Sequence, residues 1–301
     1  MFKIAYDKRY KHPLPEGHKF PMEKYELIPE QLILEGTITE NCFFSPDKVE
    51  VKDILAVHQA EYWNRLSNLQ LSDREIRKTG FPHSKSLIER ERVITGGTVQ
   101  NALYALKYGV SANIAGGTHH AFTDRGEGFC LLNDIAVSAS FLLRNAAKVS
   151  RVLVVDLDVH QGNGTAEIFK NDNRVFTFSM HGAGNYPLRK ERSDLDVELK
   201  DGTEDGDYLK TLKNILPRLI DKVEPDFIFY QCGVDILKSD KLGRLGLTVY
   251  GCKERDRFVL EMCKKHEIPV AFNMGGGYSN RLHQIVEAHA NTYRLAADIF
   301  F

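Results

Sequence analysis

One short stretch, RVLVVDLDVHQGNGTAEIF at residues 151–169, constrains the fold of this chain more than any other. Its apolar run at residues 152–155 is typical of a strand buried on both faces, as in a parallel sheet. Asp156, Asp158 and His160 follow at alternate positions, and such residues point to one face of an extended chain. Because charged groups leave water only when they are paired or bind a metal, this pattern predicts a functional site. On this stretch alone, an acidic loop that caps a helix is the simpler alternative.

Composition narrows the class of protein. The 301 residues carry 40 basic and 41 acidic side chains, and this balance argues against direct nucleic-acid binding. The five cysteines are scattered and odd in number, which fits a reduced, cytoplasmic protein better than a disulfide framework. The first ten residues are too poor in apolar side chains for a signal peptide, and no apolar run is long enough for a membrane span. The oligomeric state stays open.

Strand and helix patterns alternate along the chain. Strands are expected near residues 2–6, 111–115, 152–155, 174–181, 225–235 and 268–278. Helices are expected from about residue 22, over 49–68, 97–108, 134–143, 201–220 and 252–266, and from about residue 279. The polar segment 71–91 is expected to be a surface loop. This alternation predicts a single α/β domain over residues 1–301, with a mostly parallel sheet covered on both faces.

Four of the predicted strands end in polar or glycine-rich residues. If these strands are parallel, all four ends lie at one edge of the sheet, where open α/β sheets bind their ligands. The residues are His119 and His120, then Asp156, Asp158 and His160, then Asp235, and finally Gly275, Gly276, Gly277 and Tyr278.

Asp158, His160 and Asp235 can supply three ligands of a catalytic zinc, which keeps a further position for water. The same oxygen and nitrogen ligands suit iron. Taken singly, Asp235 is explained as well by a strand-end turn and His160 by a hydrogen-bonded core histidine. Their combination on neighbouring strand ends favours the metal site.

The adjacent His119 and His120 suit general acid–base catalysis, because histidine titrates near neutral pH. Such histidines usually donate their other ring N–H to a carboxylate or an amide, and Asp156 and Asn163 are available for this role. Two polar residues in a surface turn are the alternative for the histidine pair.

The three glycines at residues 275–277 permit a tight turn and close approach of the backbone to a ligand. Tyr278 then projects over the site, where its phenol can donate a hydrogen bond to an oxyanion. An ordinary strand-to-helix turn is the alternative.

The chain resembles the zinc-dependent histone deacetylase family in four motifs that occur in order, GGTHHAFTDRGEGFCLLND, VDLDVHQGNG, GVDIL and GGGY. The resemblance runs from about residue 92 to the C-terminus and more loosely from residue 1. DRGEGFC, DVHQGNG, GTEDGDYL and SDKLGRLGL make it most similar to the class IV branch and its bacterial relatives. It implies the arginase/deacetylase fold, with a mostly parallel sheet of about eight strands between helices on both faces.

The resemblance also implies roles for individual residues. The zinc ligands that it implies are Asp158, His160 and Asp235. The catalytic group that it implies consists of two partnered histidines, His119 with Asp156 and His120 with Asn163, and of Tyr278 as the oxyanion donor. It implies a substrate channel lined by Gly128, Phe129, Tyr186, Leu242 and Gly276. It implies a structural potassium ion held by Asp156, Asp158, His160, Ser179 and the carbonyl of Met180. The loop 78–91 has no counterpart of the aspartate that grips the substrate backbone in other branches, and YPLRKERSD departs from the usual Gly-rich turn.

We therefore expect a zinc-dependent amidohydrolase that removes acyl groups from lysine side chains by metal-activated water. His120 is expected to be the general base, and His119 an electrostatic and orienting group. Branches with the same HQGNG and DRGEGFC motifs include enzymes that prefer long fatty acyl groups, so long chains are expected over acetyl. Three alternatives remain, namely a deacylase of acylated polyamines or other small amides, an arginase-like two-metal hydrolase and a non-catalytic acyl-lysine binding module.

Overall fold

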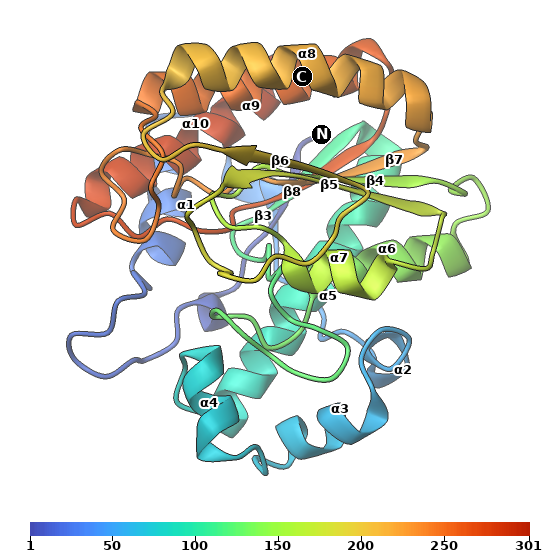
Figure 1. The fold of residues 1–301 in the computed structure, drawn as a ribbon, viewed down its shortest axis with the longest axis vertical. Coiled ribbons are helices and arrows are strands. Elements are labelled where there is room, and N and C mark those ends of the chain that lie inside the picture. Colours follow the sequence, from blue (N-terminus) through green and yellow to red (C-terminus); the bar gives the residue numbers. More distant parts are fainter.

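The computed structural model describes residues 1–301 and contains one eight-stranded sheet between two layers of helices (Figure 1). All strands pair in parallel, in the order β2-β1-β3-β8-β7-β4-β5-β6. The strands are β1 Lys3–Ala5, β2 Phe43–Phe44, β3 Val110–Asn113, β4 Val152–Asp156, β5 Val175–Gly182, β6 Leu195–Leu199, β7 Phe227–Gln231 and β8 Val270–Asn273. The predicted α/β fold with a mostly parallel sheet is confirmed.

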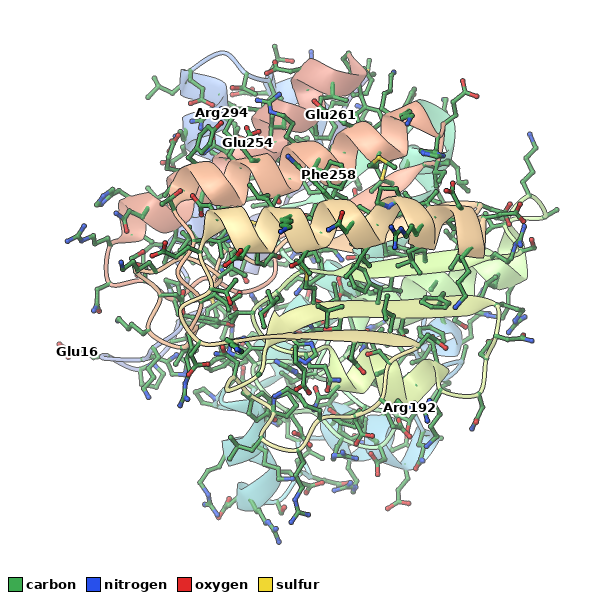
Figure 2. The ribbon with its side chains drawn as sticks, turned by 45° about the horizontal axis from the view of Figure 1, so that its top comes forward. Glu16, Arg192, Glu254, Phe258, Glu261 and Arg294 are labelled. Atoms are coloured by element: carbon green, nitrogen blue, oxygen red, sulfur yellow. The ribbon has the colours of Figure 1, made fainter.

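Ten α-helices surround the sheet. In Figure 1, α8, α9 and α10 lie on one side, α5, α6 and α7 on the other, and α2, α3 and α4 extend beyond α5. The helices are α1 Lys24–Leu34, α2 Val51–Ile54, α3 Ala60–Ser67, α4 Asp73–Thr79, α5 Lys85–Tyr108, α6 Asp134–Asn145, α7 Asn163–Phe169, α8 Asp205–Val223, α9 Val249–Lys265 and α10 Leu282–Phe300. Charged side chains such as Glu16, Arg192 and Glu261 are exposed around these layers (Figure 2). None of the helices has the length and apolar character that crossing a membrane requires.

Burial on both faces explains the continuous apolar run of β4. Leu153 and Val155 belong to the larger core cluster, whereas Val152 and Val154 belong to a second cluster. Alternate side chains of a strand point to opposite faces, so each face of β4 packs against its own layer of helices. The first residue that breaks this apolar run, Asp156, ends the strand.

The prediction of a surface loop over residues 71–91 is wrong. Ser72 caps α4 in a reciprocal arrangement with Glu75, and α4 ends at Thr79, followed by Gly80 as its C-cap with a φ of +77°. Ser84 then caps α5, which runs through the glycine pair at residues 96–97 to Tyr108. The Ser-x-x-Glu capping box is the sequence signal for α4, and the polar composition of the segment, which is also typical of loops, conceals it.

Two further local predictions need correction. The expected helix over residues 49–68 is divided into α2 and α3, which His58 and its neighbours separate. The strands β2 and β6 were not predicted from the sequence. β2 has only two residues, and β6 alternates charged and apolar side chains at the edge of the sheet, where burial is incomplete.

Arg255 of α9 links the helical layer to the strand ends that carry the predicted metal ligands. Its side chain is fully buried, and its Nη1 donates to the carbonyls of Leu157, at 3.1 Å, and Gly233, at 2.6 Å. Its Nε donates to Asp256 at 2.7 Å, which balances the buried charge. The two carbonyls lie within two residues of Asp158 and Asp235, so Arg255 fixes the backbone that positions both carboxylates.

We expect Arg255→Met to lower the free energy of unfolding by about 3–5 kcal/mol, because Asp256 then stays buried without its partner. Arg257→Met is the matched control on the same helix. It removes a partly exposed pair with Glu254 and should change stability by less than about 1 kcal/mol. Denaturant unfolding of both variants measures the difference, and equal losses would contradict this role of Arg255.

Candidate active site

The polar residues expected at the strand ends lie together at one edge of the sheet. The central strands β3, β8, β7 and β4 are neighbours in this order, and each ends at this edge. The residues that follow them form one cluster, made of His119 and His120, Gly275 to Tyr278, Asp235, and Asp156 to His160. The parallel sheet therefore explains the convergence.

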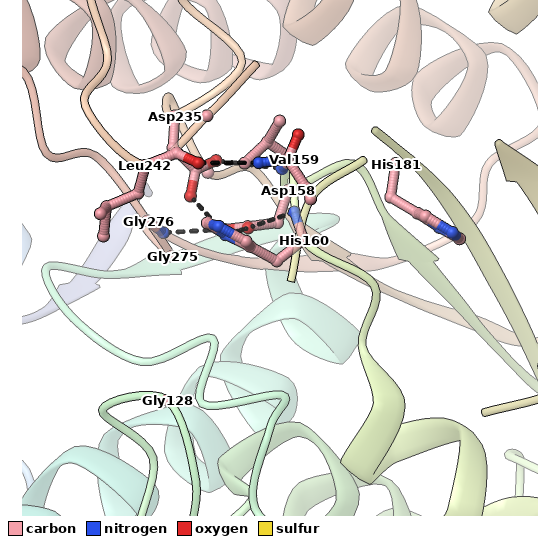
Figure 3. A network of polar contacts seen from close by, with 12 residues as sticks. Gly128, Asp158, Val159, His160, His181, Asp235, Leu242, Gly275 and Gly276 are labelled. Carbon is pink, nitrogen blue, oxygen red and sulfur yellow. Dashed lines mark hydrogen bonds and ion pairs between the residues drawn. The ribbon is translucent and has the colours of Figure 1, made fainter. Parts of the chain in front are cut away.

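Asp158, His160 and Asp235 form a compact buried triad (Figure 3). One donor atom from each lies within 4.8 Å of the other two. Nδ1 of His160 is 3.1 Å from Oδ1 of Asp158 and 3.2 Å from Oδ2 of Asp235. Oδ2 of Asp235 accepts no well-aligned hydrogen bond although it is buried. A buried carboxylate oxygen left in this way, beside an imidazole nitrogen, fits a metal ligand.

The electrostatics of the triad also fit a bound cation. Burial, together with the charge of Asp158, raises the pKa of Asp235 to about 7. Burial opposes the charged form of His160, but hydrogen bonds and charges from both carboxylates outweigh it and raise the pKa of His160 to about 10. The site therefore concentrates negative charge that a positive group must balance, and a divalent ion would do so.

The histidine pair sits on a turn that the carboxylate of Asp134 holds in place. Asp134 begins α6 and accepts hydrogen bonds from the backbone N–H groups of Gly117, at 3.1 Å, and Thr118, at 2.8 Å. The turn lets two consecutive residues face one pocket, and the rings of His119 and His120 are 4.1 Å apart between centroids. A regular strand would have placed them on opposite faces.

Each histidine has the partner that the sequence predicted. Nδ1 of His119 is 2.6 Å from Oδ2 of Asp156, and Nδ1 of His120 is 2.6 Å from Oδ1 of Asn163. Burial opposes the charge of His119, but Asp156 and Asp158 overcome it and raise the pKa to about 9. Burial and the neighbouring histidines lower the pKa of His120 well below its usual value. These opposite shifts favour a charged His119 and a neutral His120 at neutral pH.

The Gly275–Gly277 turn brings Tyr278 over the same site. The N–H of Gly276 donates to Oδ2 of Asp158 at 2.9 Å, and a side chain on Gly276 would collide with the carboxylate of Asp235. The N–H of Tyr278 donates to Oδ2 of Asp240 at 2.6 Å. Burial raises the pKa of the Tyr278 phenol well above its usual value, so it keeps its proton to donate.

A channel leads from the surface to this cluster. Its mouth has a volume of about 300 Å³ and is lined by Lys78, His120, Gly128, Phe129, His160, Tyr186, Leu242 and Tyr278. Gly128 has a φ of +53°, and a Cβ there would lie 2.7 Å from the ring of His120. Gly276 lines the inner end of the channel. Gly128, Phe129, Tyr186 and Leu242 thus lie in the wall of the mouth, and Gly276 lies in the wall of the inner end. That these residues contact a substrate stays a prediction.

A small cavity continues inward from the channel. It has a volume of about 40 Å³, and its wall includes residues from the predicted cluster. It also includes Phe20, Tyr25, Arg90 and Ile94, which lie outside the strand ends that predict the site. The cavity lies beside the triad, because Asp158 and His160 are in its wall.

Several supporting residues were not predicted. The sequence indicates Asp134 only as a helix start and indicates no role for Asp240 or Gln231. Gln231 donates from Nε2 to the carbonyl of Gly117 at 2.8 Å. Their signal is weak, because short polar residues after strands also occur in ordinary turns. The expected potassium site stays a prediction. Asp156 and Ser179 are paired neighbours on β4 and β5, and Oγ of Ser179 is 2.9 Å from Nδ1 of His181.

Comparison with known proteins agrees with this geometry. Residues 18–293 match the Histone deacetylase domain. An uncharacterised protein of Picosynechococcus is 40% identical over 99% of both chains, and Histone deacetylase 2 of Arabidopsis thaliana is 30% identical over 89% of this chain and 72% of its own. The fold is similar to the crystal structure of an HDAC homolog complexed with SAHA, with a TM-score of 0.85, 24% identity and coverage of 99% and 84%.

We expect Asp158→Ala and Asp235→Ala each to lose bound metal and activity, because only two protein ligands then remain. Asp201→Ala, which removes an exposed carboxylate, is the control and should keep both. Elemental analysis of the purified variants for zinc and iron measures the effect. Full metal content in either ligand variant would remove that residue from the metal site.

Proposed function

Because the chain belongs to the histone deacetylase family, we propose that it is a zinc-dependent hydrolase that removes acyl groups from lysine side chains. The observation that carries this proposal is the convergence of the triad, the two partnered histidines and Tyr278 on one channel. A non-catalytic binding module would have no need of two histidines with opposite protonation states. The DVHQGNG and DRGEGFC motifs favour the class IV branch within the family.

Asp158, His160 and Asp235 would hold the zinc, which when bound polarises a carbonyl group and lowers the pKa of water. His120 is suited to take the proton of the attacking water. Its Nδ1–H donates to Oδ1 of Asn163, so Nε2 carries the free lone pair. A neutral imidazole is available as a base over the whole neutral range.

His119 and Tyr278 support charge that develops during the reaction. His119 keeps its proton beside Asp156 and places a fixed positive charge next to His120, which restrains His120 from keeping the proton it receives. The same proton can then pass from Nε2 of His120 to the leaving lysine nitrogen. The protonated phenol of Tyr278 can donate to the oxyanion of the tetrahedral intermediate.

The channel mouth favours acyl-lysine over an acylated polyamine. No carboxylate lines the mouth. Glu127, the partner of Tyr186 in the mouth wall, already accepts hydrogen bonds from Tyr186, at 2.5 Å, and Arg125, at 2.8 Å. Lys78 lines the mouth and adds a positive charge. A polyamine carries several positive charges and would meet no free carboxylate there, whereas a neutral peptide backbone meets no repulsion.

The inner cavity favours a short acyl group over the long fatty acyl group expected from the motifs. The cavity of about 40 Å³ beside Asp158 and His160 is small, and the large side chains of Phe20, Tyr25 and Phe129 form part of its wall. That space suits an acetyl group or one only slightly longer. A myristoyl chain would need Phe20, Tyr25 and their neighbours to move.

We expect kcat/KM to be highest for acetyl-lysine among acetyl-, octanoyl- and myristoyl-lysine peptides of one sequence, and lower for an acetylated polyamine. The reason is that a longer acyl chain gains about 0.8 kcal/mol of binding free energy per buried methylene only if the cavity can hold that chain. A higher kcat/KM for octanoyl or myristoyl peptide would show that the cavity opens. Absence of turnover on all four substrates by the zinc-loaded protein would refute the proposed activity.

We expect His120→Ala to lower kcat more than His119→Ala, with bound metal retained in both. In the wild type, kcat should fall above pH about 9, where His119 loses its proton, since its pKa is raised to about 9. This alkaline decline should be absent from His119→Ala. The measurement is kcat against pH for the three proteins, and an unchanged profile in His119→Ala, with a small effect of His120→Ala, would reverse the two roles.

A further inference from the structure

Lys24 occupies a position that a lysine rarely takes in a folded protein. It is the first residue of α1, the helix end at which the macrodipole disfavours positive charge. Its side chain has no exposed area, it forms no ion pair, and its ammonium makes a single hydrogen bond, to the carbonyl of Gly275 at 3.2 Å. Burial lowers the pKa of Lys24 to about 8, which expresses the cost of this placement.

The hydrogen bond of Lys24 acts on the glycine turn beside the triad. The peptide unit between Gly275 and Gly276 presents its carbonyl to Lys24 and its N–H to Oδ2 of Asp158. Gly275 has a φ of +67° and carries no side chain that could restrain it. The Gly275–Gly276 peptide is therefore held on both sides, by Lys24 at its carbonyl and by the carboxylate of Asp158 at its N–H.

The same ammonium lies close to the aromatic ring of Tyr278. Its Nζ is 5.8 Å from the centroid of that ring, 5.0 Å from the ring of Phe20 and 5.5 Å from the ring of Tyr25. A cation at this distance is attracted by the ring and withdraws electron density from it, and the attraction is greater where water is excluded. A phenol polarised in this way is a stronger hydrogen-bond donor.

We propose that Lys24 is a positioning residue for the oxyanion-binding side of the site, which fixes the Gly275–Gly276 peptide and polarises the Tyr278 phenol. This inference rests on the proposed hydrolase activity, in which Tyr278 donates to the oxyanion. Packing alone does not explain the residue, because an apolar side chain of the same length would fill the space without burying a charge.

The first test is a double-mutant cycle of Lys24→Met and Tyr278→Phe, measured on an acetyl-lysine peptide. We expect Tyr278→Phe to lower kcat by about 10²–10³-fold. We expect Lys24→Met to lower kcat by about 10–100-fold with little change in KM, as for other residues that act through a neighbouring group. In the Tyr278→Phe background, Lys24→Met should lower kcat by less than about threefold, because the group it acts through has lost its hydroxyl.

Equal effects of Lys24→Met in the two backgrounds would overturn the proposal. Lys24→Gln, which keeps a polar head without the charge, is the second variant if Lys24→Met folds poorly, and it should show the same dependence on Tyr278. Lys107→Met is the matched control, because Lys107 lies 5.1 Å from the ring of Tyr108 at the exposed end of α5 and should leave kcat unchanged.

The second test does not depend on turnover. Hydrogen exchange followed by mass spectrometry should show faster exchange for a peptide covering residues 274–281 in Lys24→Met than in the wild type. The melting temperature and metal content should stay within error of the wild type. If the wild type hydrolyses no acyl substrate, the proposed function fails and the exchange result alone decides on Lys24. Unchanged exchange in this segment would contradict a positioning role.

Discussion

The burial of two carboxylates side by side, Asp158 and Asp235, is the constraint on which the rest of the structure depends. Both are fully enclosed, and their mutual repulsion favours unfolding unless positive groups and N–H donors compensate it. The backbone N–H of Val159 donates to Asp235, and those of His160 and Gly276 donate to Asp158. Arg255 donates hydrogen bonds to the backbone carbonyls of Leu157 and Gly233, next to the two carboxylates. The loops after β4 and β8 supply these N–H donors, and they meet because the central strands are parallel and end at one edge.

A second set of carboxylates fixes the loops without taking part in the predicted chemistry. Asp134 binds the turn that carries the histidine pair, and Asp240 binds the N–H of Tyr278 together with those of Leu242 and Gly243. Each accepts at least two backbone hydrogen bonds, so the loop it holds cannot relax without exposing buried N–H groups. Such preorganisation places donors and bases before the substrate arrives, which is where electrostatic catalysis gains most.

The sequence predicted the centre of the site better than its wall. Apolar runs that are followed by Asp156, Asp235 or Gly275 indicate both a strand and a site, because a buried apolar segment gives way there to a polar or glycine-rich one. Lys24 and Arg90 give no such signal, because they reach the site through packing between segments distant in the sequence. The helices within residues 71–91 were missed for a local reason, as their capping residues are ones that also occur in loops.

The family motifs predict the residues at the centre of the site, but they do not predict the residues that line its inner cavity. Residues from the motifs supply the triad, the histidines and Tyr278, on which the proposed reaction depends. The far wall of the inner cavity comes from Phe20 and Tyr25 in the N-terminal segment and from α5, which contribute no motif. Because large aromatic side chains form this wall, a change in their size or position alters which acyl groups fit. Relatives can thus share every catalytic residue and still differ in acyl preference, and acyl length has to be read from packing rather than from motifs.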